Sequence, residues 1–264
     1  MWCEGCGTAY PKRQIIICGR DEYVWDFRIH RPTFCLPTNW RNWNMVQEKY
    51  EDLHNTWDSI DSLDFYLDEI DSVKEIYTRE FGIMGKVLDV GGGQGRLRHF
   101  LSKDKIPLYV CVDPFITVFN NIDAQSNLLR AYPCLSDPCP FVVCHAEFLP
   151  FRNNSFDWVH LRSVLDHFSD PYLAIKEAYR VLGDAGTILL GLTVTGGNSS
   201  LIGRLSRLGH GKREQEVNDH TFHWHYADLC FILKEQNFQI KKEHWQKPPF
   251  DMCVYMSATK KVIS

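Results

Sequence analysis

The chain has 264 residues, of which 44% are hydrophobic and 23% are charged, and its formal net charge is −4. This length accommodates one α/β domain with additions, or one domain with a small module, and buries a large core without disulfide staples. The acidic balance and the lack of a basic stripe disfavour a nucleic-acid partner. No apolar run approaches the roughly 20 residues that are needed to span a bilayer.

Ten cysteines are scattered through the sequence, several of them in apolar stretches: Cys111, Cys144, Cys230 and Cys253. Free cysteine behaves as a small buried hydrophobic residue in reducing compartments. The chain also begins without a basic segment followed by an apolar run, so no signal peptide is expected. We therefore expect core thiols and a cytoplasmic protein.

Residues 1–80 are expected to form an N-terminal segment that covers the site of the main domain. Cys3 and Cys6 have the spacing of a zinc knuckle, but a closed structural site needs four ligands and a second CxxC motif is missing. Loose substitutes are Cys18, His30 and Cys35. A degenerate ribbon held together by packing is therefore favoured over bound zinc.

A helix is predicted in the later part of this segment. Its apolar residues recur at spacings of three and four, a pattern typical of an amphipathic helix: Leu63, Leu67, Ile70, Val73 and Tyr77. The acidic residues between them are expected to face water.

From residue 81 onward, short apolar strands alternate with helices. The strands are expected at residues 86–90, 108–112, 141–144, 156–161 and 187–192, the helices at 95–101, 171–182 and 225–236, and two closing strands at 238–246 and 253–259. This alternation predicts an α/β fold: a Rossmann-like three-layer sandwich with a mostly parallel seven-stranded sheet, helices on both faces and an antiparallel closing strand. Residues 193–224 are expected to be a lid insertion.

The strongest local signal is the glycine-rich turn that follows the first of these strands, Val87 to Gly95. Glycines after a strand permit positive φ and a close approach of the backbone to a ligand, and the next helix aims its N-terminal amides at that ligand. Asp113 ends the second strand, where an acid hydrogen-bonds the hydroxyls of an adenosine ribose. Asp89, at the end of the first strand, is placed to meet a ligand amine or the amides of the turn.

A nicotinamide dinucleotide site is the competing interpretation of this turn. Its fingerprint requires a third glycine three positions after the second. Counted from Gly91 and Gly93, that position is Arg96, which is bulky and charged. The pyrophosphate-binding pattern is therefore incomplete.

Taken together, these motifs resemble those of class I S-adenosylmethionine-dependent methyltransferases. The turn resembles their first motif, and Asp113 matches their ribose acid. The segment 145–151 resembles the one beside the adenine, 154–159 the fourth-strand motif, and 177–182 with Gly186 the helix and turn before the fifth strand. The resemblance implies S-adenosyl-L-methionine as cofactor, bound by Asp89, Gly91, Gly93, Gln94, Gly95, Asp113, Pro114, Ala146, Glu147, Phe148, Leu161 and Arg162.

The resemblance also places the acceptor beyond the carboxyl end of the fourth strand, where residues 161–168 lie. His167 is the residue there that is able to take a proton near neutral pH. It is the candidate catalytic base, with Asp166 as a candidate orienting residue. The alternative is that His167 caps or packs the following helix.

A second histidine cluster spans residues 219–226. Spaced histidines suggest a metal site, but the sequence does not show the surroundings that such a site needs, and no metal is assigned. His220 is the member favoured as a catalytic residue, and Trp224 is a candidate to stack on a sugar ring or a planar acceptor. Substrate contact and local structure both remain open for this cluster.

The leading functional hypothesis is an O-methyltransferase that acts on a small molecule or a glycan. One alternative is an RNA base methyltransferase, because residues 6–11 resemble half of the zinc ribbon that precedes some bacterial methyltransferases. N- or S-methylation of a small molecule is another. A non-catalytic protein that binds the cofactor or activates a partner would show a damaged turn or lack Asp113, and neither is the case. The sequence does not indicate an oligomeric state.

Overall fold

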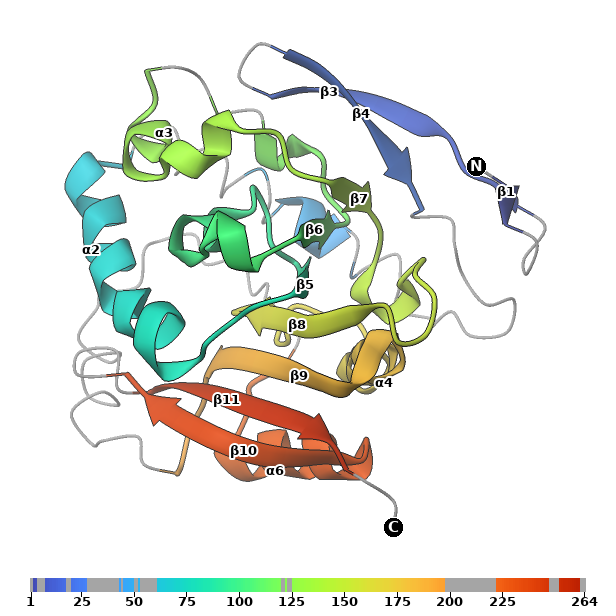
Figure 1. Cartoon of the computed structure of the whole chain (residues 1–264), viewed down its shortest axis with the longest axis vertical. Coiled ribbons are helices and arrows are strands. Elements are labelled where there is room, and N and C mark those ends of the chain that lie inside the picture. The colour runs from blue at the N-terminus through green and yellow to red at the C-terminus, as the bar shows by residue number, and fades with distance from the viewer. Residues whose placement is uncertain are drawn as a thin grey trace.

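The computed structural model describes residues 2–3, 8–17, 20–27, 43, 45–49, 52, 61–119, 122, 125–197, 222–246 and 252–261. Within these ranges the main sheet has nine strands in the order β10-β11-β9-β8-β5-β6-β7-β4-β3 (Figure 1). The strands of its centre and one edge are β5 (Lys86–Val90), β6 (Leu108–Asp113), β7 (Phe141–Val143), β8 (Phe156–Arg162), β9 (Leu182–Thr193), β10 (Phe238–Trp245) and β11 (Cys253–Lys260).

The central strands form the parallel core of this sheet. β7, β6, β5, β8 and β9 pair in parallel, and β11 pairs antiparallel with both β9 and β10. The carboxyl ends of β5, β6 and β8 therefore meet at one edge of the sheet, where ligands bind in open α/β folds. The predicted fold class and the antiparallel closing strand are confirmed.

Helices cover both faces of the sheet: α2 (Leu63–Glu75), α3 (Asn127–Ala131), α4 (Pro171–Val181) and α6 (Tyr226–Glu235). Successive residues of a strand point to opposite faces. Leu88 and Val90 of β5 accordingly belong to the core that α4 and α6 cover, whereas Val87 belongs to the core under α2 and α3. This is the three-layer arrangement that the sequence predicts.

Two further strands extend the sheet at its other edge, so the predicted number of seven strands is wrong. They form the antiparallel hairpin β3 (Lys12–Ile17) and β4 (Arg20–Asp26), and β4 pairs in parallel with β7. Tyr10, Val24 and Phe27 are buried there, which favours docking of the hairpin. Two shorter strands, β1 (Trp2–Cys3) and β2 (Thr8–Ala9), form a separate pair.

Helix α2 exists where the sequence predicts it, but it is rotated relative to the predicted stripe. Ser62 caps it by accepting the amide of Phe65, and a π-helix, Ile76–Glu80, continues it. Tyr66 is fully buried while Leu67 is 44% exposed, because the large Tyr66 ring fills the space against the sheet. The buried stripe thus runs through Tyr66, Ile70, Val73 and Tyr77.

Two other details differ from the prediction. The helix expected after the glycine turn is a 3₁₀-helix, Arg96–Phe100. The turn expected at residues 183–186 lies inside β9, where the register with β8 shifts between Phe156 and Trp158. Of the expected lid, residues 198–221 lie outside the described ranges, while Thr195 and His225 at its two ends form a parallel bridge.

Candidate active site

The turn after β5 is a left-handed glycine loop. Gly91, Gly93 and Gly95 have φ values of 65°, 52° and 82°, a region that side-chain-bearing residues rarely adopt. A Cβ atom on Gly92 would lie 2.5 Å from Asp89 Oδ2 and 2.7 Å from Cys111 Sγ, whereas a Cβ atom on Gly93 would meet nothing within 4 Å. The loop is therefore closed on the Gly92 side and open at Gly93.

Asp113, at the end of β6, joins that strand to the loop. Its Oδ2 accepts the amide of Gly93 at 3.2 Å, and its Oδ1 accepts the amide of Phe115 at 3.0 Å. Burial raises the pKa of this carboxyl to about 7, although the two backbone donors lower it. Each oxygen still has accepting capacity for a ligand hydroxyl.

Asp89 lies beneath the loop. The Tyr109 hydroxyl donates to its Oδ2, and His160 Nδ1 lies 2.7 Å from its Oδ1. Both carboxylate oxygens are thus engaged inside the protein, where the Asp89 side chain supports the loop from below. Its predicted contact with a ligand amine stays a prediction.

A chain of buried polar groups leads from Asp89 to Arg162 at the end of β8. The Tyr77 hydroxyl lies 2.9 Å from His160 Nε2, and side-chain hydrogen bonds join Tyr77 to Tyr255 and Tyr255 to Arg162. Burial raises the pKa of Tyr77 well above its usual value and that of Tyr255 to about 12. Both phenols therefore stay neutral near pH 7.

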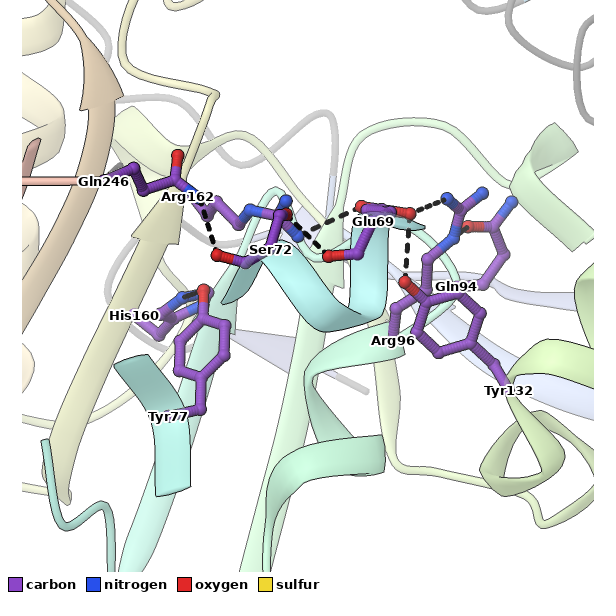
Figure 2. Close-up of polar contacts among 9 residues, drawn as sticks. All are labelled: Glu69, Ser72, Tyr77, Gln94, Arg96, Tyr132, His160, Arg162 and Gln246. Carbon is purple, nitrogen blue, oxygen red and sulfur yellow. Dashed lines mark hydrogen bonds and ion pairs between the residues drawn. The ribbon is translucent and has the colours of Figure 1, made fainter. Parts of the chain in front are cut away.

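Glu69 of α2 closes the other side of the loop, and the sequence interpretation missed it. Figure 2 shows its carboxylate between two guanidinium groups: Arg162 Nη1 is 3.1 Å from Oε1, and Arg96 Nη1 is 3.4 Å from Oε2. Tyr132 donates its hydroxyl to Oε2 at 2.9 Å. Burial raises the pKa of this carboxyl, but the charges of Arg96 and Arg162 lower it. The lowering effects win, so the net pKa lies below its usual value.

The expectation that the acids of this helix face water is therefore wrong for Glu69. Its side chain is 22% exposed. Glu69 falls between Tyr66 and Ile70 on the inner face of the helix, and only the burial of Tyr66 reveals that face. An acid in that position needs a partner inside the protein.

The loop after β7 holds the next predicted residues, Ala146, Glu147 and Phe148, in a buried 3₁₀ turn. Glu147 Oε1 accepts the Ser169 amide at 2.9 Å, the Ser169 hydroxyl at 3.1 Å and the Asp170 amide at 3.1 Å. Glu147 thereby fastens this loop to the beginning of α4. Burial raises its pKa, while these donors oppose the shift.

The candidate acceptor face is the loop that follows β8. A Cβ atom on Gly91 would lie 2.6 Å from Val164 Cγ1, so this loop packs directly on the glycine turn. The His167 amide donates to the Val164 carbonyl at 3.0 Å, and Trp43 Nε1 donates to the His167 carbonyl at 2.6 Å. His167 thus lies one turn from Val164, the residue that packs on Gly91, and Trp43 of the N-terminal segment contacts its carbonyl.

Asp166 belongs to the same loop. Its carbonyl accepts the amide of Phe222 at 3.2 Å, which brings the end of the insertion to this face. A hollow of 370 Å³ adjoins it, lined by Ser169, Asp170, Tyr172, Phe222, Trp224 and Asp228, among others. The candidate base His220 lies outside the described residues.

Comparison with known proteins agrees with this geometry. Residues 88–190 match the sequence family described as "Methyltransferase domain". The uncharacterized protein MJ1123 of Methanocaldococcus jannaschii is 24% identical over 200 residues, which are 75% of this chain and 79% of that protein. The ubiquinone/menaquinone biosynthesis C-methyltransferase UbiE of Rickettsia typhi is 32% identical over 109 residues, or 39% of this chain and 42% of UbiE. The chain thus spans about two fifths of the UbiE length.

A solved structure with the same fold is the 1,6-didemethyltoxoflavin-N1-methyltransferase of Burkholderia thailandensis, whose crystals contain S-adenosylhomocysteine. It has a TM-score of 0.57 and 15% identity, over 88% of this chain and 93% of that one. The chain carries a class I S-adenosylmethionine-dependent methyltransferase domain. The cofactor of this domain is S-adenosylmethionine.

The residues around the loop of the methyltransferase domain fit this cofactor. The open side at Gly93 leaves room for a ligand against the backbone, and Asp113 at that edge has accepting capacity for ribose hydroxyls. Gln94 is buried and accepts a hydrogen bond from Arg96 Nε at 3.1 Å, whereas Pro114 is half-buried. The Leu161 side chain lies in the core. The cofactor contacts of these residues remain predictions.

In the described ranges there is no group of three or more His, Cys, Asp or Glu side chains able to hold a metal ion. The helices of the same ranges are too short or too polar to cross a membrane. Cys111 and Cys144 are free and buried, and burial raises the pKa of both thiols well above its usual value. Cys230 and Cys253 are only half-buried.

Proposed function

We propose that the protein transfers the methyl group of S-adenosylmethionine to an oxygen atom of a small molecule or a glycan. The observation that carries this proposal is the direct packing of the loop 163–168 on the glycine turn, with Val164 against Gly91 and His167 one turn further on. Methyl transfer needs in-line positioning of the acceptor and, for an oxygen acceptor, removal of its proton.

His167 is the proposed base. As the acceptor oxygen attacks the methyl carbon, the carbon–sulfur bond of the cofactor breaks, S-adenosylhomocysteine leaves, and the acceptor proton passes to the imidazole. Asp166 is proposed to orient this loop. The connection of Trp43 to the His167 carbonyl supports the idea that the N-terminal segment holds the base in place.

The hollow beside this loop is the proposed acceptor site. Phe222 and Trp224 have ring centroids 6.1 Å apart, and Tyr172 on α4 is 47% exposed. Aromatic side chains bind planar groups and the apolar faces of sugars. Asp170 and Asp228 line the same hollow, and their carboxylates are able to accept hydroxyl donors.

The acceptor of UbiE does not transfer to this chain. The similarity to UbiE covers 39% of the chain, and the matched family segment 88–190 ends before the hollow is completed by residues 222–228. N- or S-methylation is the alternative within small-molecule chemistry. An RNA acceptor is disfavoured by the net charge of −4.

The test is a methylation assay with a panel of phenols, sugars and RNA, read by mass spectrometry. His167→Ala should lose about 10²- to 10⁴-fold in turnover, while the affinity for S-adenosylhomocysteine stays unchanged. His244→Ala on β10 is the matched control and should keep full activity. Full activity in both His167→Ala and His220→Ala would contradict O-methylation and favour a nitrogen or sulfur acceptor.

A further inference from the structure

The cluster of Glu69, Arg96 and Arg162 joins three separate parts of the fold (Figure 2). Glu69 comes from α2, Arg96 follows the turn, and Arg162 ends β8. The cluster brings two guanidinium groups to one carboxylate. All three side chains are largely buried, with exposed fractions of 22%, 17% and 27%.

A partly buried guanidinium is costly unless its N–H donors are used. A guanidinium with unused donors therefore favours an anion beside it.

Arg162 still has donors for such an anion. Within the described ranges it donates to Glu69 and to Tyr255, whereas a guanidinium carries five N–H donors in a rigid fork. His160 pairs with Asp89 across the β5–β8 ladder. Two residues further along β8, Arg162 thus lies level with the glycine turn, at the edge where the cofactor is expected.

Glu69 is itself held in place by several hydrogen bonds. Its Oε2 accepts from Tyr132 at 2.9 Å and from Arg96 at 3.4 Å, while its Oε1 accepts from Arg162. The Ser72 hydroxyl donates to the Glu69 carbonyl at 2.7 Å, which stiffens this turn of the helix. Glu69 therefore restricts the position of the Arg162 guanidinium.

We infer that Glu69 is a positioning residue for recognition of the amino-acid end of the cofactor. It holds Arg162 so that the guanidinium pairs with the methionine carboxylate, in the bidentate manner that arginine favours. This inference rests on the proposed function, because it takes S-adenosylmethionine as the ligand at the turn. It assigns helix α2, outside the matched segment 88–190, a part in cofactor selectivity.

Calorimetric titration of the full chain with two ligands tests this inference. S-adenosylhomocysteine carries the amino-acid end, whereas 5′-methylthioadenosine keeps the adenosine and the sulfur but lacks that end. Glu69→Gln should weaken S-adenosylhomocysteine binding on the order of tenfold, the loss of about one charge-assisted hydrogen bond. Its affinity for 5′-methylthioadenosine should not change.

Two further variants complete the test. Glu75→Gln on the same helix removes an exposed ion pair with Arg79 and should affect neither ligand. Tyr132→Phe removes one bond to Glu69 without changing any charge, so it remains informative even if Glu69→Gln fails to fold. It should weaken S-adenosylhomocysteine binding a few-fold and leave 5′-methylthioadenosine binding unchanged.

The outcomes separate the two proposals. Unchanged or tighter binding of S-adenosylhomocysteine by Glu69→Gln, or an equal loss for both ligands, would overturn the positioning role alone. A wild-type chain that binds neither ligand would overturn the proposed function together with this inference.

Discussion

Alanine substitutions at two adjacent glycines of the turn should both lower stability but should differ in their effect on cofactor binding. At Gly92 a Cβ atom would lie 2.5 Å from Asp89 Oδ2, 2.6 Å from Asp89 Cγ and 2.7 Å from Cys111 Sγ. Asp89 cannot move aside without breaking its bonds to Tyr109 and His160. Gly92→Ala should therefore cost about 1–3 kcal/mol of unfolding free energy, as overpacking of a core typically does.

At Gly93 the new methyl group meets no protein atom within 4 Å, but the φ of 52° is left-handed. Gly93→Ala should therefore cost only about 1–2 kcal/mol of stability, the strain of a left-handed L-residue. Its methyl group projects into the open side of the turn. The affinity for S-adenosylhomocysteine should consequently fall at least about tenfold, or ~1.4 kcal/mol.

Thermal denaturation with and without S-adenosylhomocysteine measures both effects. Gly82→Ala is the matched control, since Gly82 has open space and no positive φ, and it should behave as wild type. For Gly92→Ala we expect a lower melting temperature in the unliganded protein. For Gly93→Ala we expect the loss of most of the ligand-induced stabilisation. A Gly93→Ala protein that binds the ligand as tightly as wild type would refute the assignment of the open side to the cofactor.

The remaining predictions concern Asp113, the insertion and the N-terminal cysteines. Because the pKa of unliganded Asp113 is raised to about 7, and ribose hydroxyls favour its ionised form, cofactor affinity should rise about tenfold per pH unit up to pH 7 and then level off. Titration of Asp113→Asn should show no such slope, and a slope that persists would contradict this role. In the unliganded protein Asp113 keeps its proton up to about pH 7, whereas in the unfolded chain it loses that proton near pH 4. The free energy of unfolding should therefore fall as the pH rises from about 4 through 7, and denaturant melts can follow this loss. Hydrogen exchange over residues 193–224 should slow when cofactor and acceptor are added, and equal exchange would indicate a fixed insertion. Elemental analysis should find less than one zinc per chain, and a full equivalent would restore the zinc-ribbon hypothesis.

The central parallel strands were predictable because each is a short and mostly apolar run, as Val87 to Val90 shows. The β3–β4 hairpin was not, since its strands mix charged and apolar residues and the pairing of β4 with β7 depends on contacts distant in sequence. Local periodicity also could not show that Tyr66, rather than Leu67, fills the space under α2.

In the site, too, the local features were predictable from the sequence, whereas the contacts between distant segments were not. The glycine turn and Asp113 are local features of the sequence, and the structure joins them through the amide of Gly93. The role of Glu69 depends on Arg96, 27 residues away, and Arg162, 93 residues away. Asp89 was predicted at the turn, but its two neighbours Tyr109 and His160 come from adjacent strands, and only the strand order reveals them.

The most direct test of the central claim is a calorimetric titration of the full chain with S-adenosylhomocysteine at pH 8, beside Asp113→Asn. We predict one binding site per chain, and a loss of about 1.5–3 kcal/mol of binding free energy in the variant, as expected for hydrogen bonds to a charged group. Absence of binding by the wild-type chain, or equal affinity in Asp113→Asn, would contradict the claim that the turn after β5 and the end of β6 hold the cofactor.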